Sequence, residues 1–316
     1  LCRINNNNPH LDISFMNITS VESSHIQLFD VQSVENIVID GLTFSDGSLD
    51  LLLSFTEFSS LTLTNSKFFN FTITQLLEFR GDPEFKQHIR IENLEFKFGE
   101  FSGTIFNFAG VSAIVSRLEF SGNTHTESVL FSGDSSIEFL YLNFEDETVN
   151  PNSIFFNFQA DGTKRSPGIN ISASKFVNLI FEGTPIALKD FDISLTSSIF
   201  RDIFLYFPLI SQTISGWVLG KSCNFSANQL ESITYGGGPL ISVETTGNGN
   251  NCSFIFSQNI LSSMTGRASI YGFDEISAIT YVAGNIFQKS DIVGGVFTIN
   301  RKSSHNFDRS EEHTSE

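Results

Sequence analysis

Apolar and polar residues alternate along this chain in short runs that recur at a nearly fixed interval. One phenylalanine marks each repeat, and the residues seven and five positions before it are apolar in all fourteen cases, from Ile37 and Ile39 to Ile193 and Leu195. Chance would give this agreement on the order of once in 10⁵ to 10⁶ trials at the apolar content of the chain. The anchors, spaced by 24, 28, 24, 24, 32 and 24 residues, are Phe44, Phe68, Phe96, Phe120, Phe144, Phe176 and Phe200.

Each repeat predicts three short strands. The alternation before the anchor is interrupted by a pair such as Asp40-Gly41 or Thr64-Asn65 and then resumes in the other phase. Asn and Gly accept the left-handed conformation, so the interruption predicts a corner. A third apolar run follows, such as "TIFNF" after Gly103. A unit of this size cannot close its own core, but copies stacked on one another can.

The sequence therefore predicts an all-β protein, a right-handed single-stranded parallel β-helix. We expect a three-sheet solenoid of about eleven coils of 24–32 residues, roughly 50 Å long at ~4.8 Å per coil. Equivalent phenylalanines would stack in one interior ladder, since aromatic rings pack well at this separation. The "FNF" and "FKF" segments of residues 93–108 would supply further ladders. A leucine-rich horseshoe has a similar period but requires a Leu/Asn signature and usually a helix per unit, which these repeats lack.

The repeats are expected to occupy residues 33–300. Residues 1–32 read as irregular N-terminal coils with a weak anchor at Phe15, and the later anchors are Phe225, Phe256 and Phe287. Residues 301–316 read as a disordered tail, whose end, Arg309–Glu316, resembles a translated sequencing adapter and is left out of the fold prediction. The chain starts with Leu, shows no signal peptide and has no apolar run near the ~18 residues of a membrane span. We interpret it as a fragment.

The net charge of the chain limits the kinds of molecule that it can bind. Asp and Glu number 35 against 18 Lys and Arg, which gives a net charge of −17. Such a chain is repelled by nucleic acids and by anionic membranes. Cationic partners, metal ions and neutral glycans remain.

Two short motifs carry a resemblance to a known family. Tetrapeptides of the form FxxN recur, and the glycine-rich segments Gly236–Ile241 ("GGGPLI") and Gly294–Phe297 ("GGVF") are similar to the GGA-[ILV] motif. This pairing resembles the repeats of chlamydial polymorphic outer-membrane proteins and of Phe-rich β-helical surface proteins of protists. The resemblance implies an extracellular passenger used in adhesion. We favour a non-catalytic extracellular or cell-surface module without a cofactor, for adhesion or for binding a glycan or a surface protein. The FxxN segments are Phe120–Asn123, Phe225–Asn228 and Phe256–Asn259.

The alternative is a carbohydrate-active enzyme of the pectin-lyase type whose catalytic coils are divergent or missing. Its usual motifs do not occur, the histidines are isolated, and the acidic run Glu145–Glu147 lacks the basic neighbours of a calcium-dependent lyase site. Glu95 and Glu119 share one outward position in adjacent coils, at ~5 Å, the spacing of a retaining glycosidase pair. Because this position faces solvent on a flat sheet, a charge ladder that includes Lys67 is the favoured interpretation. No catalytic or metal-binding residue is therefore predicted.

Long repeats suggest where a partner would bind. Their extra residues follow the third strand, at residues 80–88, 159–167 and 245–251, so all three loops are expected at one edge of the solenoid. Insertions in repeat proteins often map to the binding face, although loops also tolerate added length at little cost. The candidate binding residues are Arg80, Asp82, Lys86, His88, Asp161, Lys164 and Arg165.

The cysteines and the N-glycosylation sequons are informative about the cellular compartment of the protein. Cys223 and Cys252 each stand two residues before a Phe, and a 29-residue coil would place them ~4.8 Å apart, within reach of a disulfide. An extracellular location favours the bond and a cytosolic one favours free thiols. The alternative register, Phe225 beside Phe256, moves Cys252 by two positions and removes the bond. Sequons occur at Asn17, Asn70, Asn170, Asn224 and Asn251, about as many as chance gives, and Asn70 and Asn170 are the glycosylation candidates.

Overall fold

The computed structural model is an all-β parallel solenoid, as predicted, with about nine turns against the eleven expected. The part of the chain that it describes contains no helix long and apolar enough to cross a membrane. The chain divides into two compact units, residues 1–157 and 158–316, which we describe separately. The described residues are 2–5, 10–19, 27–80, 87–160, 167–215, 221–246, 252–274, 278–295, 297–300, 306–309 and 313–314.

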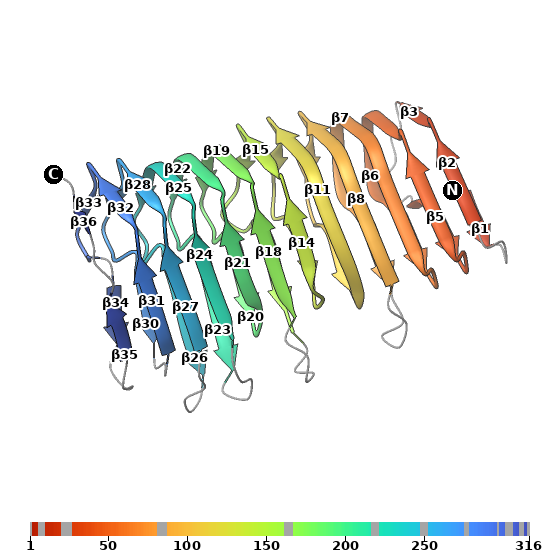
Figure 1. Ribbon diagram of the computed structural model, residues 1–316. Helices are drawn as coiled ribbons and strands as arrows, with labels where there is room; N and C mark the ends of the chain where they lie inside the picture. The colour runs from red at the N-terminus through yellow and green to blue at the C-terminus, as the bar shows by residue number, and fades with distance from the viewer. Residues whose placement is uncertain are drawn as a thin grey trace. The chain divides into compact units, whose positions relative to one another are not determined.

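Unit 1 consists of strands joined by corners (Figure 1). Several strands run through a corner, so one long strand contributes to more than one sheet. The strands are β1 (Cys2–Asn5), β2 (His10–Ser14), β3 (Asn17–Thr19), β4 (Gln27–Gln32), β5 (Asn36–Asp40), β6 (Thr43–Thr56), β7 (Ser60–Arg80), β8 (Gln87–Lys97), β9 (Glu100–Phe101), β10 (Thr104–Ala109), β11 (Val111–Ser121), β12 (Thr124–His125), β13 (Val129–Gly133), β14 (Ile137–Leu140), β15 (Asn143–Glu145), β16 (Thr148–Val149) and β17 (Ile154–Gln159).

Every coil of unit 1 adds a strand to each of three parallel sheets. The first sheet runs from β2 through β5, β7, β8 and β11 to β14. The second begins with β3 and β6 and continues through the later parts of β7, β8 and β11 to β15. The third contains β1, β4, β6, β7, β10 and β13. The coils therefore stack in the way that the repeat predicts.

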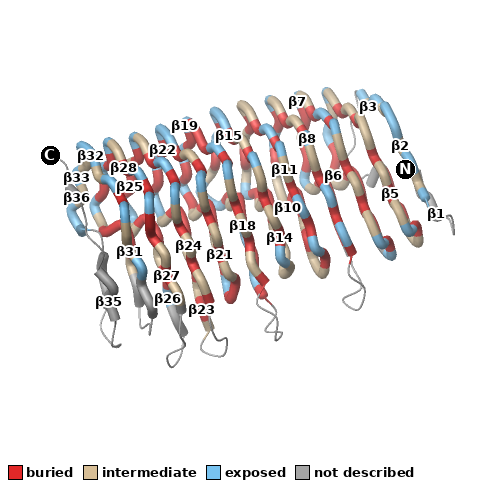
Figure 2. The backbone as a smooth tube through the Cα atoms, in the orientation of Figure 1, coloured by how far each residue is buried: buried red, intermediate tan, exposed pale blue. Residues whose placement is uncertain are grey.

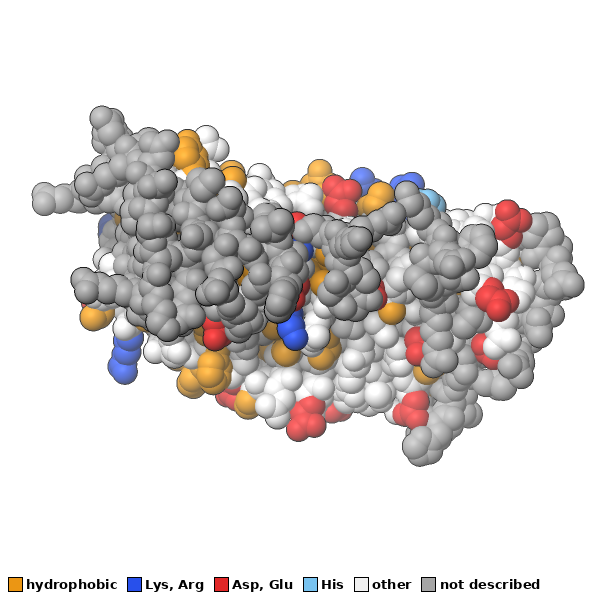
Figure 3. All heavy atoms as spheres, turned by 90° about the horizontal axis from the view of Figure 1, so that it is seen from below, with side chains coloured by type: hydrophobic (Ala, Val, Ile, Leu, Met, Phe, Trp, Pro, Cys, Tyr) orange, Lys and Arg blue, Asp and Glu red, His pale blue; other side chains and the backbone are white. Residues whose placement is uncertain are grey.

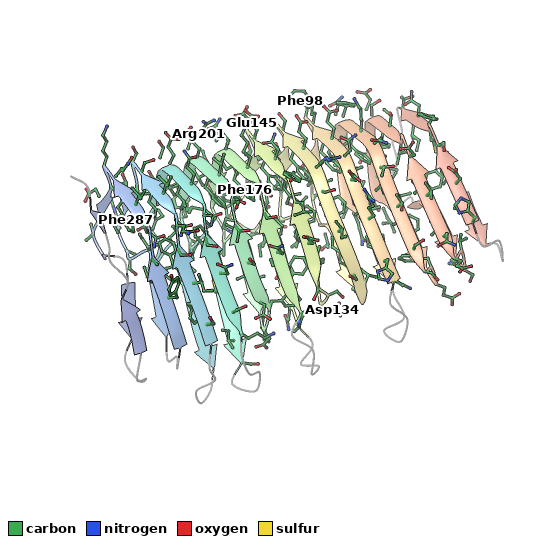
Figure 4. All side chains as sticks on the ribbon, in the orientation of Figure 1. Phe98, Asp134, Glu145, Phe176, Arg201 and Phe287 are labelled. Atoms are coloured by element: carbon green, nitrogen blue, oxygen red, sulfur yellow. The ribbon has the colours of Figure 1, made fainter. Side chains whose placement is uncertain are left out.

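The phenylalanine ladder is confirmed within each unit. In unit 1 Phe44, Phe68, Phe96, Phe120 and Phe144 are consecutive register partners, and the stacked rings from Phe68 onward lie 4.7–4.8 Å apart. In unit 2 the Phe176 and Phe200 rings lie 4.8 Å apart and nearly parallel. All seven side chains are buried, as are the fourteen apolar residues before them. Figure 2 shows the buried positions recurring from coil to coil, and Figure 4 shows Phe176 inside its coil.

Two corners, rather than one, bend each coil on either side of the anchor. The predicted corner, three residues before the anchor, is left-handed at Gly41, Asn65, Asn93 and Ser197. A second left-handed corner lies two residues after the anchor, for example at Asp46. In three coils of unit 1 it is followed by the short strands β9, β12 and β16.

Unit 2 has the same coil plan. Its first sheet contains β18, β21, β24, β27, β31 and β35, its second contains β19, β22, β25, β28 and β32, and its third contains β20, β23, β26, β30 and β34. The strands are β18 (Gly168–Ser172), β19 (Lys175–Phe181), β20 (Ile186–Lys189), β21 (Asp192–Thr196), β22 (Ile199–Leu205), β23 (Ile210–Ser215), β24 (Ser222–Ser226), β25 (Gln229–Tyr235), β26 (Ile241–Thr246), β27 (Cys252–Ser257), β28 (Ile260–Ser262), β29 (Thr265–Gly266), β30 (Tyr271–Asp274), β31 (Ala278–Ala283), β32 (Ile286–Gln288), β33 (Asp291–Ile292), β34 (Phe297–Asn300), β35 (Asn306–Arg309) and β36 (His313–Thr314).

Two of the later anchors were assigned to the wrong row. Phe200 lies beside Leu230, whereas Phe225 and Phe256 continue the row of Leu195, five residues before the anchor. The anchor row continues instead through Leu230 and Leu261 to Phe287, so that Phe287 alone was placed correctly. Leu replaces Phe in the anchor row while Phe fills a neighbouring inward row, and the spacing of phenylalanines is then misleading.

Two phenylalanines of unit 1 expected inside the solenoid lie outside it. Ile18, not Phe15, is the register partner of Phe44, and the Phe15 side chain is 84% exposed at a left-handed corner. Phe98 of the "FKF" segment occupies the second corner and is 69% exposed (Figure 4). The "FNF" segment does form ladders: Phe108 stacks on Phe79, and Phe106 stacks on Phe131.

The FxxN segments of unit 2 mark corners. Asn228 and Asn259 follow left-handed residues and are buried, and each side-chain NH₂ donates to a carbonyl of the preceding coil, at 2.9 Å and 3.0 Å. Each Asn also accepts a backbone N–H: Ser198 N donates to Asn228 and Asn228 N donates to Asn259. Asn285 continues the ladder in the next coil. The asparagines therefore satisfy backbone groups that the corner removes from the sheets.

Candidate functional site

The strongest candidate site is a group of exposed aromatic side chains in unit 2. They lie at the end of β22 and directly after it, where Phe204, Tyr206 and Phe207 are 39%, 49% and 50% exposed. Alternation along β22 buries Ile203 and Leu205 and turns Phe204 and Tyr206 outward. Their rings meet edge to face, with centroids 4.9 Å apart.

The neighbouring coil on one side extends this apolar surface. Ile180 of β19 is the register partner of Phe204 and is 55% exposed. We call Ile180, Phe204, Tyr206 and Phe207 the aromatic platform. Exposed apolar patches of this kind commonly mark interaction sites.

Two glycines of the next coil flank the platform on one side. Phe181 and Tyr235 flank Leu205 in register, the Tyr206 N–H donates to the Phe181 carbonyl and the Gly236 N–H donates to the Leu205 carbonyl, so Tyr206 lies between Glu182 and Gly236. A Cβ added to Gly237 would lie 1.8 Å from the Tyr206 carbonyl oxygen, whereas a Cβ added to Gly236 would meet nothing within 4 Å. The "GGGP" segment therefore packs against the backbone of the aromatic corner without covering its rings.

Charged residues border the platform. Glu182 is exposed beside Tyr206, and Asp202 precedes Phe204 by two residues in β22. Arg201, which points outward in Figure 4, places its Nε 3.6 Å from an Asp202 carboxylate oxygen. Among the described side chains no Lys or Arg lies within ion-pair distance of Glu182. The platform therefore combines apolar rings with one carboxylate that has no cationic partner in the described part of the chain.

Most of the predicted loop candidates fall outside the described residues, namely Asp82, Lys86, Asp161, Lys164 and Arg165. Arg80 ends β7, and His88 is exposed in β8. The flanking strands place both inserted segments between the third strand of one coil and the first strand of the next, as predicted. The binding role of these loops stays a prediction.

A buried polar cluster in unit 1 was missed by the sequence analysis. His125 Nε2 lies 2.7 Å from a Glu147 carboxylate oxygen, and His125 Nδ1 lies 3.2 Å from Ser128 Oγ. Glu147 also accepts the Asn123 side-chain NH₂ at 3.0 Å, and the His125 ring stacks on Phe101. The sequence indicates this cluster only through polar residues at inward positions of consecutive coils, in the segments "NTH" (residues 123–125) and "DET" (residues 146–148).

This cluster has the connectivity of a serine nucleophile, a base and an orienting carboxylate. However, His125 and Ser128 are fully buried and Glu147 is 3% exposed. A nucleophile must reach a substrate, so the cluster as it stands supports the core rather than chemistry on an external molecule. The hydrogen bonds satisfy its polar atoms, as buried groups require.

The Glu95–Glu119 register is as predicted, and so is its interpretation as a charge ladder. Lys67 Nζ lies 3.3 Å from Glu95, and Lys97 pairs with Glu95 and lies 3.7 Å from Glu119. The hydrogen bond from Lys97 lowers the pKa of Glu95 below its usual value, with a smaller contribution from Lys67. Glu95 is thus paired with two lysines on the outer face of the sheet, as in a charge ladder.

Metal ligands are likewise not grouped. Among the residues that the structure describes, no three His, Cys, Asp or Glu side chains are placed to hold a metal ion. Figure 3 shows acidic side chains, coloured red, scattered over the part of this face that is not grey.

The cysteines take the register in which no disulfide was expected. In the structure Phe225 lies beside Phe256. Cys223 therefore lies beside Phe254, and Cys252 lies two positions away along the neighbouring strand. Cys223 is a buried free thiol, and burial raises its pKa to about 12. The thiol is therefore protonated at neutral pH.

The alternation of inward and outward residues along a strand accounts for the spacing of Asn and Ser in two of the sequons. Asn170 and Ser172, and likewise Asn224 and Ser226, are outward positions two residues apart in β18 and β24, half-buried on one sheet. Asn17 is exposed in β3, and Asn251 lies outside the described residues. Asn70 is exposed at a left-handed corner, where its side-chain NH₂ donates to Asp46 at 2.7 Å. Whether Asn70 or Asn170 carries a glycan stays a prediction.

Comparison with known proteins identifies no relative of this chain. No family model matches it, and no match is found among curated proteins or among solved structures.

Proposed function

We propose that this protein is a non-catalytic binding module of an extracellular or cell-surface protein, and that its aromatic platform binds glycans. The observation that supports the proposal most directly is the exposure of Phe204, Tyr206 and Phe207 beside Gly236 and Gly237 of the next coil. Pyranose rings present apolar C–H faces that pack on aromatic rings, and their hydroxyls hydrogen-bond to neighbouring polar side chains. An open, exposed surface suits an extended polysaccharide better than a small molecule, which needs a concave pocket.

Two further points support this proposal. The FxxN and "GGGPLI" segments resemble repeats of chlamydial polymorphic outer-membrane proteins, in which such repeats serve adhesion. The net charge of −17 disfavours polyanionic ligands, including acidic polysaccharides, because long-range repulsion opposes their approach. We therefore expect neutral or basic glycans.

The test is retention of the full chain on insoluble neutral polysaccharides such as cellulose and chitin. We expect Phe207→Ser and Tyr206→Ser to weaken binding about tenfold, which corresponds to ~1.4 kcal/mol for one lost ring contact. Tyr281→Ser is the matched control, because Tyr281 is 45% exposed on β31, a strand of a different sheet of unit 2. Equal retention of all four proteins, or an equal loss in the control, would contradict the proposal.

A further inference from the structure

Glu182 suggests which glycans the platform prefers. It lies beside Tyr206 on the adjacent coil, and side chains at equivalent positions of neighbouring strands stand next to each other. No Lys or Arg in the described part of the chain neutralises it, whereas Asp202 is paired with Arg201. A group bound on the Tyr206 ring would therefore lie next to an unneutralised carboxylate.

Aromatic faces and carboxylates attract the same kind of group. A cation within about 6 Å of a ring centroid is stabilised by the ring quadrupole, by ~0.5–1 kcal/mol at exposed sites. An adjacent carboxylate adds a Coulombic term of similar size. Both terms favour an ammonium group over a neutral acetamide or hydroxyl.

We propose that the platform prefers glycans with free amino groups, such as oligomers of glucosamine, over their N-acetylated and neutral counterparts. This inference rests on the proposed glycan binding at the same site. Charge complementarity is its basis: the local carboxylate is Glu182, and the whole chain carries −17. The sugar ring packs on Tyr206 and Phe207, and its ammonium group lies toward Glu182.

Gly236 allows the charge at the site to be changed without disturbing the fold. It lies on the side of Tyr206 opposite Glu182, its φ is not left-handed, and an added side chain meets no atom within 4 Å of the Cβ. Gly236→Glu and Gly236→Arg thus add side chains of similar length and opposite charge at the edge of the platform. Both added side chains cover the edge of the platform to a similar extent, so a difference in glycan affinity between the two variants reports the effect of charge.

The experiment is calorimetric titration of the full chain with glucosamine, N-acetylglucosamine and cellulose oligomers of equal length. The glucosamine oligomer is expected to bind most tightly. Glu182→Gln and Gly236→Arg should each weaken its binding about two- to fivefold, Gly236→Glu should bind it more tightly than Gly236→Arg, and added salt should reduce these differences. Glu244→Gln, which removes an exposed carboxylate from β26, is the matched control and should leave binding unchanged.

The outcomes separate the two proposals. Equal affinity for all three oligomers, with no effect of Glu182→Gln, would overturn the amine preference while glycan binding stands. Binding of the glucosamine oligomer that Glu244→Gln weakens as much as Glu182→Gln would show general attraction to an acidic protein and would also overturn it. If no oligomer binds, and the cellulose and chitin retention is absent as well, glycan binding itself is wrong.

Discussion

Bulky residues occupy corners whose backbone usually requires glycine or asparagine. Phe98, Arg117 and Tyr141 have φ values of 55°, 55° and 57°, a conformation that costs an L-residue roughly 1–2 kcal/mol. Their neighbours in the coil stack impose it, because the strands on both sides of each corner are fixed in register. The Phe98 ring lies against Gly122 of the next coil, where an added Cβ would approach it to 3.1 Å. The stacking of coils therefore overrides the preference of these bulky residues for a negative φ.

The interior ladder makes a central phenylalanine costly to remove. Phe120 stacks between Phe96 and Phe144 and is fully buried. We expect Phe120→Ala to lower the free energy of unfolding by about 3–5 kcal/mol, since it leaves a cavity that the neighbouring coils cannot fill. Urea denaturation measures the change. Ile114→Ala on the same strand, where the side chain is 48% exposed, is the control and should cost under ~1 kcal/mol; similar losses in both would mean that the ladder does not form the core.

At the scale of the element, the stacked corner asparagines Asn228, Asn259 and Asn285 make hydrogen bonds to the backbone that the sheets provide elsewhere. The Asn259 side chain accepts the Asn228 backbone N–H and donates to the Phe225 carbonyl. We expect Asn259→Leu to cost about 2–4 kcal/mol even though Leu is similar in size and apolar, because it leaves two buried backbone groups without partners. Thermal unfolding followed by circular dichroism checks this. A stabilised Asn259→Leu would contradict the capping role of this side chain.

The charge ladder on the second sheet predicts a pH dependence. The pKa of Glu95 is lowered from 4.5 in the folded chain by Lys97 and Lys67. A depressed carboxyl pKa contributes stability that is present above the unfolded-state value and is lost as the pH falls through the folded-state value. Glu95→Gln should therefore reduce the stability of the chain near neutral pH, and the difference from wild type should shrink below pH 4.5. Unfolding midpoints measured from pH 7 down to ~3 test this, and a difference that stays constant would exclude the ladder as its source.

At the scale of the whole molecule, the sequence predicts the coil but not every register. Where Phe occurs in the anchor row, as in Phe44 to Phe144, spacing alone identifies the ladder. Beyond Phe200 the anchor becomes Leu230 and Leu261, and phenylalanine moves to the row of Leu195. Left-handed corners identify the true rows, and Ala227 and Gln258 give no such signal in sequence.

The candidate site was harder to predict for a related reason. Exposure of Tyr206 and Phe207 depends on the flanking coils, where Gly236 and Gly237 are distant from them in sequence. Phenylalanine is abundant and mostly buried in this chain, so nothing in the sequence singled out Phe204 and Phe207. Likewise, His125 and Glu147 meet only because consecutive coils superimpose.

The identical corners at both ends of the anchor strand have a consequence for the gene. Residues 97–120 and 121–144 occupy the same rows of successive coils, each with 24 residues. Each coil of unit 1 meets its neighbours through the same three sheets, so recombination between repeats that gains or loses one full period would leave the remaining rows aligned. The loss of a single residue within a strand would instead turn the inward side chains of that strand outward, whereas a change in length within the loop after the third strand leaves the rows aligned, as between Phe68 and Phe96. Variation in the length of such a protein should therefore arise in these loops or in whole coils, and the number of coils should vary much as copy number varies in a tandem array.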